Sequence, residues 1–97
     1  MNSVSFPLDR IRRLCREAGV VRAYLFGSAL TSEFQRDSDV DVIVETDPNR
    51  PPGILRLGGL QMDLSELLGR NVHMTLLGGV PEHERAGILA RARRLDG

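Results

Sequence analysis

Two short apolar segments with polar junctions constrain the fold of this chain most strongly. Residues 20–26 form a run of valine, aromatic and other apolar residues that ends abruptly at Gly27-Ser28. Residues 40–45 alternate valines with other side chains, and Asp39 comes directly before them. Runs of this length that are rich in β-branched and aromatic residues favour strands. The pattern therefore predicts two strands, the first ending in a glycine turn and the second beginning at acidic residues.

The rest of the chain alternates helical and extended patterns around these two strands. Apolar side chains recur at helical spacing over residues 7–18 and 55–68, and residues 72–77 predict a third strand. A short helix is expected over residues 29–34, and a last helix begins at Pro81. This last helix is expected to turn its apolar side chains inward, namely Ile88, Leu89, Ala92 and Leu95. The order predicts an α+β (or α/β) fold with a small mixed sheet of at least three strands flanked by helices.

Composition narrows the function classes that such a small chain can serve. Its 97 residues fit a single domain over residues 1–97, in which 13 basic side chains balance 13 acidic ones. The net charge of zero argues against nucleic acid as a direct substrate. Every basic residue is arginine, which excludes a lysine Schiff base and the lysine of a phosphate-binding P-loop.

The sequence also carries signals of location. Its single cysteine, Cys15, points to a reducing compartment, and residues 1–7 lack the basic and apolar regions of a signal peptide. No apolar run approaches the roughly 20 residues that span a bilayer. We therefore expect a cytoplasmic protein without membrane contact.

The junctions of the first two strands carry the candidate chemistry. A strand that ends in Gly27-Ser28 offers backbone N–H groups and a hydroxyl to a phosphate, and glycine allows a ligand to come close. Ten residues separate Ser28 from Asp39, and Asp41 lies two positions further on. Side chains two positions apart in a strand face the same side, so both carboxylates are expected to project together. Because Mg²⁺ binds one or two carboxylates together with substrate phosphates, the pattern indicates nucleotidyl transfer.

These residues resemble the signature of the minimal nucleotidyltransferases of the polymerase-beta-like superfamily. The signature is Gly-Ser, a ten-residue spacer and Asp-x-Asp, and residues 27–28 and 39–41 carry it here. The likeness extends to residues 64–72, before the third expected strand, and to residues 88–92 in the last expected helix. It covers nearly the whole chain and implies a polymerase-beta-like palm.

The resemblance also implies roles for individual residues. Asp39 and Asp41 are expected to be the catalytic residues that bind Mg²⁺, with Mn²⁺ as the alternative ion. Gly27 and Ser28 are expected to hold the triphosphate of ATP, the substrate. Family members of this size commonly act as antitoxins of HEPN-type toxins, and some transfer AMP from ATP to a tyrosine of the toxin. A HEPN-type partner is therefore implied, while homo-oligomerisation stays open.

Two positions depart from the family pattern. The family usually has a third carboxylate on the third strand, where this chain has His73. His73 either acts as a general base or marks a lost acid and an impaired enzyme. Relatives also often carry Arg-Gly after Gly-Ser, whereas residues 29–31 contain no basic side chain and Arg36 is a nearby replacement. The alternative functions are an antitoxin that neutralises its partner by binding alone, and a nucleotide-sensing domain.

Overall fold

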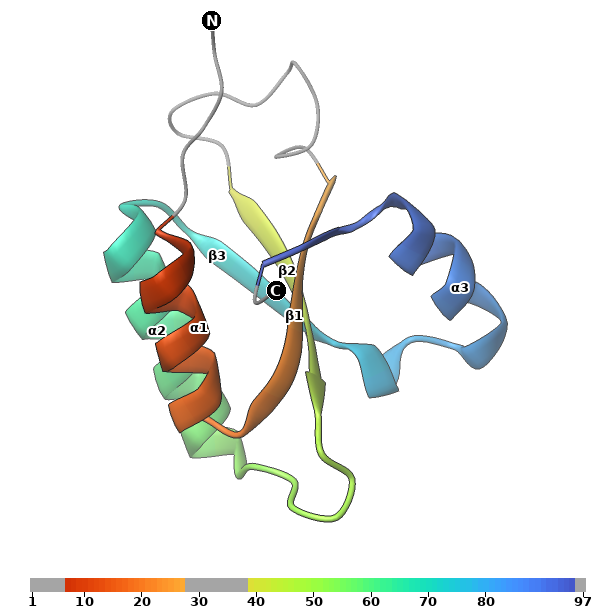
Figure 1. Ribbon diagram of the computed structural model, residues 1–97, viewed down its shortest axis with the longest axis horizontal. Helices are drawn as coiled ribbons and strands as arrows, with labels where there is room; N and C mark the ends of the chain where they lie inside the picture. The colour runs from red at the N-terminus through yellow and green to blue at the C-terminus, as the bar shows by residue number, and fades with distance from the viewer. Residues whose placement is uncertain (1–6, 28–38, 96–97) are drawn as a thin grey trace, which may run out of the picture.

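The computed structural model describes residues 7–27 and 39–95, and these residues form helices packed on a sheet (Figure 1). The described ranges contain α1 (Leu8–Glu17), β1 (Val20–Phe26), β2 (Val40–Thr46), α2 (Ile54–Leu68), β3 (Val72–Leu76), the 3-10 turn η2 (Leu77–Gly79), α3 (Glu82–Arg91) and β4 (Arg93–Arg94). The expected short helix over residues 29–34 lies outside the described residues. The α+β class with a small mixed sheet is confirmed.

The sheet combines antiparallel and parallel neighbours. Its strand order is β3-β2-β1-β4, with β1 antiparallel to both β2 and β4 and with β2 parallel to β3. Parallel neighbours need a long crossover between them, and α2 supplies it. The N-terminal ends of β2 and β3 therefore lie at the same end of the sheet as the C-terminal end of β1.

The hydrophobic core fills the space between one face of the sheet and the helices α1 and α2. In β2 the alternate residues Val40, Val42 and Val44 are at most 2% exposed, so this strand presents one apolar face to the helices. Leu64 of α2 and Ile11 of α1 pack into the same cluster, at 1% and 0% exposure. The buried valines thus turn Asp41 and the other intervening residues to the opposite face.

The boundaries of α1 and α2 follow signals that the sequence carries. The sequence predicts α1 over residues 7–18 and α2 over residues 55–68. Helix α1 is one residue shorter at each end, whereas α2 begins one residue earlier and ends where predicted. Gly69 ends α2 with φ +67°, a left-handed conformation that favours glycine, and its N–H donates to the Ser65 carbonyl. Gly58 and Gly59 do not interrupt α2.

The C-terminal segment differs from the expectation. Helix α3 ends at Arg91, Ala92 is extended, and residues 93–94 form the short strand β4 against β1. The Leu95 N–H donates to the Ala23 carbonyl at 2.8 Å, and Leu95 is 4% exposed. The predicted helix was too long because an open sheet edge offers hydrogen bonds that compete with the last helical turn.

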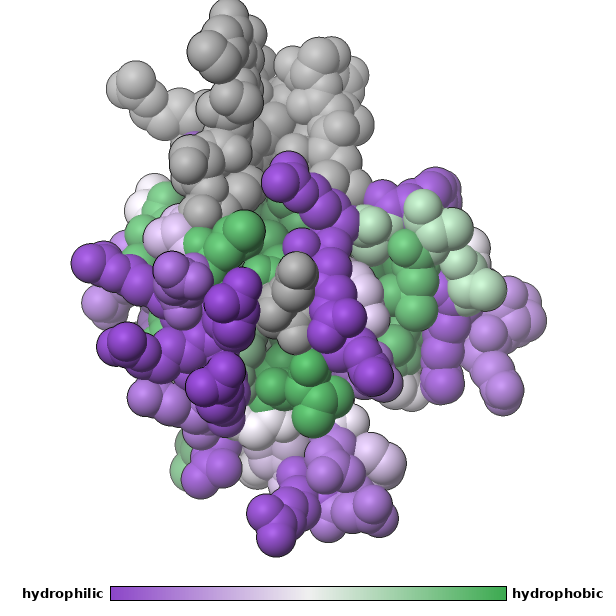
Figure 2. Space-filling view, in the orientation of Figure 1, coloured by the Kyte–Doolittle hydropathy of each residue, from purple (hydrophilic) through white to green (hydrophobic). Residues whose placement is uncertain are grey.

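Helix α3 itself buries no residue. Ile88 and Leu89 were expected to be buried but are only half-buried. Figure 1 shows α3 standing apart from α1 and α2, and Figure 2 shows hydrophobic side chains still visible over this helix. The helix is thus attached mainly through its two ends.

Two smaller observations concern the thiol and the membrane. Cys15 is a thiol on the core side of α1 and is 2% exposed. Across residues 7–27 and 39–95, every helix is too short or too polar to cross a membrane.

Candidate active site

The turn after β1 requires glycine for two reasons. Gly27 adopts φ +81°, which side-chain-bearing residues rarely do. A Cβ atom at this position would lie 2.5 Å from the Asp41 Oδ2 atom. The backbone at the end of β1 is therefore in close contact with a carboxylate from the next strand. Ser28, the other expected phosphate ligand, lies outside the described residues.

Three neighbouring strands contribute to one row of side chains next to this turn. In the strand register Phe26 of β1 is opposite Asp41 of β2, and Asp41 is opposite His73 of β3. Residues opposite each other in neighbouring strands lie on the same face of a sheet, so the three side chains are neighbours on the face away from α1 and α2. The register thus brings His73 into the acidic site, across 32 residues of sequence from Asp41.

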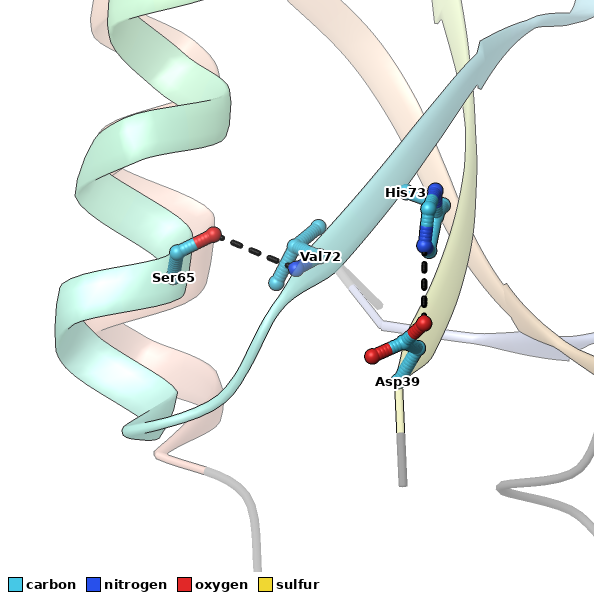
Figure 3. A network of polar contacts seen from close by, with 4 residues as sticks. All are labelled: Asp39, Ser65, Val72 and His73. Atoms are coloured by element: carbon cyan, nitrogen blue, oxygen red, sulfur yellow. Dashed lines mark hydrogen bonds and ion pairs between the residues drawn. The ribbon is translucent and has the colours of Figure 1, made fainter. Parts of the chain in front are cut away.

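Asp39 joins this row from the segment just before β2. Its Oδ2 atom lies 2.9 Å from the Nε2 atom of His73 (Figure 3). Because an ionised carboxylate only accepts hydrogen bonds, the Nε2–H of His73 is the donor in this contact. The side chains of His73 and Asp39 are 63% and 49% exposed, so solvent and ligands reach both.

Two hydrogen bonds beside the site tie the start of β3 to α2 and to β2. The hydroxyl of Ser65 in α2 accepts the Val72 N–H at 3.2 Å (Figure 3). The Val40 N–H donates to the Asn71 carbonyl at 2.9 Å. Since Val72 precedes His73 directly and Val40 lies between the two aspartates, these bonds fix the site's three polar side chains relative to one another.

The residues present suit a hard cation with two protein ligands. The oxygens of Asp39 and Asp41 are the ligand type that Mg²⁺ prefers, and Mg²⁺ commonly keeps water and substrate phosphates in its remaining positions. Within residues 7–27 and 39–95, no group of three His, Cys, Asp or Glu side chains is placed to hold a metal ion. His73 therefore does not complete a three-ligand site, and the one Asp39 oxygen that it contacts is already hydrogen-bonded.

Arg91, the last residue of α3, also lies near this row. Its guanidinium carbon is 5.9 Å from the centroid of the Phe26 ring, and its Nε donates to the Gly87 carbonyl. The contact was missed because it depends on the chain turning back after α3, which the helical pattern hid. The side chain of His83 is 83% exposed, and its Nε2 atom lies 3.8 Å from the Oε2 atom of Glu84. Arg36 lies outside the described residues.

A shallow hollow of about 460 Å³ lies at the C-terminal end of α2. It is lined by Ser65, Glu66, Gly69, Arg70 and Asn71. In Figure 3 the side chain of Ser65 approaches β3 from the helix side, whereas His73 lies on the other side. Strand β3 therefore separates this hollow from the acidic row.

Comparison with known proteins places this geometry in a family. The sequence profile of the nucleotidyltransferase domain family matches residues 8–95. A solved structure described as a minimal nucleotidyltransferase is 30% identical, with a TM-score of 0.74 over 88% of this chain and 85% of the other. No curated protein matches this chain.

Two solved toxin–antitoxin complexes share the fold at lower identity. One is described as a toxin–antitoxin with AMP-PNP and is 21% identical, with a TM-score of 0.73 over 93% of this chain and 73% of the other. The second is a tri-AMPylated HEPN toxin of Shewanella oneidensis in complex with MNT antitoxin. It is 19% identical, with a TM-score of 0.64 over 91% of this chain and 67% of the other. The match of the family profile to nearly the whole chain shows that the protein belongs to the nucleotidyltransferase domain family, as a member of the minimal nucleotidyltransferase type.

Proposed function

We propose that this protein is an Mg²⁺-dependent nucleotidyltransferase that moves AMP from ATP onto a HEPN-type toxin and thereby acts as its antitoxin. The contact between Gly27 and Asp41 carries the proposal. A backbone turn of the kind that binds phosphate lies against a carboxylate of the kind that binds Mg²⁺, with no room for a Cβ between them. A nucleotide that binds together with a metal ion would use both groups, the backbone for its phosphates and the carboxylate for the ion.

The residues divide the work of the reaction. Asp39 and Asp41 hold the metal, and Gly27 and Ser28 accept the triphosphate at the end of β1. A hydroxyl of the partner would attack the α-phosphorus and release its proton to water. The bond from the α-phosphorus to the oxygen that bridges to the β-phosphate would break, and pyrophosphate would leave. The metal, when bound, lowers the energy of the charge that develops on the attacking and leaving oxygens. The half-exposed carboxylates suit this chemistry, since a large acceptor protein must reach them.

The proposed partner rests on the fold neighbours. Two of them are described as complexes between a toxin and an antitoxin, and one of these contains an AMPylated HEPN toxin. We also propose a single domain over residues 1–97 and a cytoplasmic reaction, in keeping with the reducing compartment expected for a chain with one cysteine.

A second candidate function is neutralisation by binding alone. The contact between His73 and Asp39 favours it, because the imidazole occupies the place of an acid and uses one oxygen of a metal ligand. In this case the site no longer transfers AMP, and the antitoxin only masks its partner. Survival of cells that express a HEPN-type toxin together with this protein distinguishes the two functions. The double variant Asp39→Ala/Asp41→Ala loses protection if transfer is required and keeps it if binding suffices.

The direct experiment incubates the protein with α-labelled ATP, Mg²⁺ or Mn²⁺ and a HEPN-type toxin. The proposal predicts label on the toxin with wild-type protein and none with Asp39→Ala/Asp41→Ala. Asp9→Asn is the matched control, because Asp9 is 96% exposed on α1 and is not among the site residues. Equal labelling by wild type and the double variant, or no labelling by either with both metals, contradicts the proposal.

A further inference from the structure

The outer face of α2 is apolar although it faces solvent. Ile54, Leu55 and Met62 are 86%, 90% and 67% exposed, the highest values among the large apolar side chains described as exposed. Positions 55 and 62 are seven residues apart and lie on the same side of the helix, opposite the buried Leu60 and Leu64. Exposed apolar residues gathered on one helix face mark interaction surfaces more often than single ones do.

Two glycines lie between Leu55 and Met62 on this face. Among the described residues, no atom beyond the adjacent residues and the local helix backbone lies within 4 Å of a Cβ built at Gly58 or at Gly59, and neither glycine has a positive φ. Glycine inside a helix is unfavourable relative to alanine, and neither space nor backbone conformation requires it here. The glycines do, however, make the middle of the face flat, so that another helix can approach its backbone closely.

One positive and one negative side chain lie beside this face, so the same surface of a second copy carries the opposite charges that they need. Arg56 in the first half of α2 and Asp63 in the second half are seven residues apart and both are exposed. They lie on one flank of the apolar face, by the spacing of the helix. No ion pair of either side chain is found within the described part of the chain. Asp63 also borders the open groove between α1 and α2, whose other wall carries Arg10 and Arg13.

An antiparallel pair of α2 helices satisfies all of these groups at once. With a two-fold axis between Gly58 and Gly59, Leu55 of one copy meets Met62 of the other, and the reverse contact is identical. The same axis brings Arg56 within two residues, about 3 Å along the helix, of the second copy's Asp63, on the same side of the contact. A parallel two-fold pair would instead place the two charged flanks on opposite sides of the contact, where they form no pairs. The charge pattern therefore selects a second copy of this chain in the antiparallel orientation.

We propose that this protein forms a two-fold symmetric homodimer through the outer face of α2. The N-terminal half of α2 lies at the end of the fold away from the acidic site (Figure 1), so the dimer leaves both sites open. The contact centres on a single helix pair, which places it among small interfaces with a dissociation constant on the order of 10 µM. This proposal is independent of the proposed function.

Sedimentation velocity over a concentration series tests the dimer. Wild-type protein is expected to change from monomer to dimer as its concentration passes the micromolar range. Leu55→Asp and Gly59→Val, which place a charge or a bulky side chain at the contact, are expected to weaken association at least about tenfold. Arg16→Asp, on the exposed surface of α1, is the matched control and is expected to leave it unchanged. Far-ultraviolet circular dichroism verifies that every variant is folded.

Exchanging the charges at positions 56 and 63 tests whether the two α2 helices pair in the antiparallel orientation. Arg56→Asp alone and Asp63→Arg alone each place like charges opposite one another and are expected to weaken self-association. An equimolar mixture of the two variants restores both opposite-charge contacts, and so does the double variant Arg56→Asp/Asp63→Arg. Wild-type protein that stays monomeric up to about 1 mM, far above the expected constant, overturns the proposal. A dimer that is insensitive to Leu55→Asp, or a mixture no stronger than its components, also overturns it.

Discussion

The two faces of the sheet differ in what covers them. The face toward α1 and α2 carries the valines of β2, which are at most 2% exposed. The opposite face carries Asp41 and Glu45 on the same strand, with Ile43 buried between them, and the turn η2 contacts this strand. Residues of the main core and the residues proposed to bind ligands therefore alternate along one strand. Substitutions on the two faces are therefore expected to have different effects.

The largest expected effect concerns the charge of the acidic row. Asp41→Asn keeps the shape of the side chain but removes a metal ligand, so AMP transfer is expected to fall by about a thousandfold, equivalent to ~4 kcal/mol. The midpoint of thermal unfolding is expected to stay within a few degrees of wild type, because Asp41 is not part of the core. Labelling rates and calorimetry on the same sample measure both quantities. A large loss of stability with normal AMP transfer would show that Asp41 supports the fold and not the reaction, contrary to this comparison of the two faces.

The covered face is expected to respond in the opposite way. Leu64→Ala opens a cavity in the core beneath α2 and should lower the free energy of unfolding by about 2–5 kcal/mol. Leu89→Ala on the half-buried face of α3 should cost less than about 1 kcal/mol. Urea denaturation of both variants measures the difference. Equal losses would show that α3 contributes to the core as much as α2 does.

Substitution of Gly27 is expected to affect both the stability of the fold and the transfer reaction. Gly27→Ala forces a side chain into a left-handed conformation and against Asp41, so we expect a loss of about 1–2 kcal/mol in the free energy of unfolding. Because the methyl group displaces the Asp41 carboxylate, transfer should fall further than the stability loss explains. Rates measured well below the unfolding midpoint separate the two effects. A variant with wild-type transfer would remove Gly27 from the site.

Substitution of His73 by aspartate is expected to raise the rate of AMP transfer about tenfold, equivalent to ~1.4 kcal/mol in activation free energy. His73→Asp restores a carboxylate opposite Asp41 and releases the Asp39 oxygen that the imidazole contacts. His73→Asn, which is also polar but uncharged, is the matched control. Lower transfer by His73→Asp than by wild type would show instead that the imidazole takes part in the reaction.

The smallest expected effect belongs to Arg91. Removing its contact with Phe26 in Arg91→Ala should lower the free energy of unfolding by about 0.5–1 kcal/mol. Arg91→Lys keeps the charge and should retain part of this contribution. Chemical denaturation of the two variants against wild type provides the measurement. No difference between the alanine variant and wild type would show that α3 is held in place without this contact.

Local patterns were sufficient for much of the fold. The strand over residues 20–26, the start of β2 at residue 40 and the glycine after α2 follow from apolar runs and from turn residues. The end of α3 did not, since residues 92–95 have helical spacing but gain more from hydrogen bonds to the edge of β1. The sequence around residues 92–95 does not indicate this pairing, because the strand they pair with, β1, lies 70 positions earlier in the chain.

The candidate site was predictable in its parts but not in its contacts. The spacing of Asp39 and Asp41 indicated a shared face, and His73 was recognised only as the replacement for an acid. Its hydrogen bond to Asp39 depends on the register of two parallel strands, and a shift of one residue would turn His73 to the core. Arg91 was missed for the same reason, since its neighbour Phe26 is set by tertiary structure.

The central claim is that a metal-bound nucleotide lies between the end of β1 and the start of β2. Paramagnetic Mn²⁺ with a non-hydrolysable ATP analogue tests this directly, because it broadens the amide signals of nearby residues in nuclear magnetic resonance spectra. We predict selective broadening at Gly27, Asp39 and Asp41 that is lost in Asp39→Asn/Asp41→Asn. Broadening that is absent at these residues, or that centres on Gly69 and Arg70 in the hollow beside α2, would contradict the account.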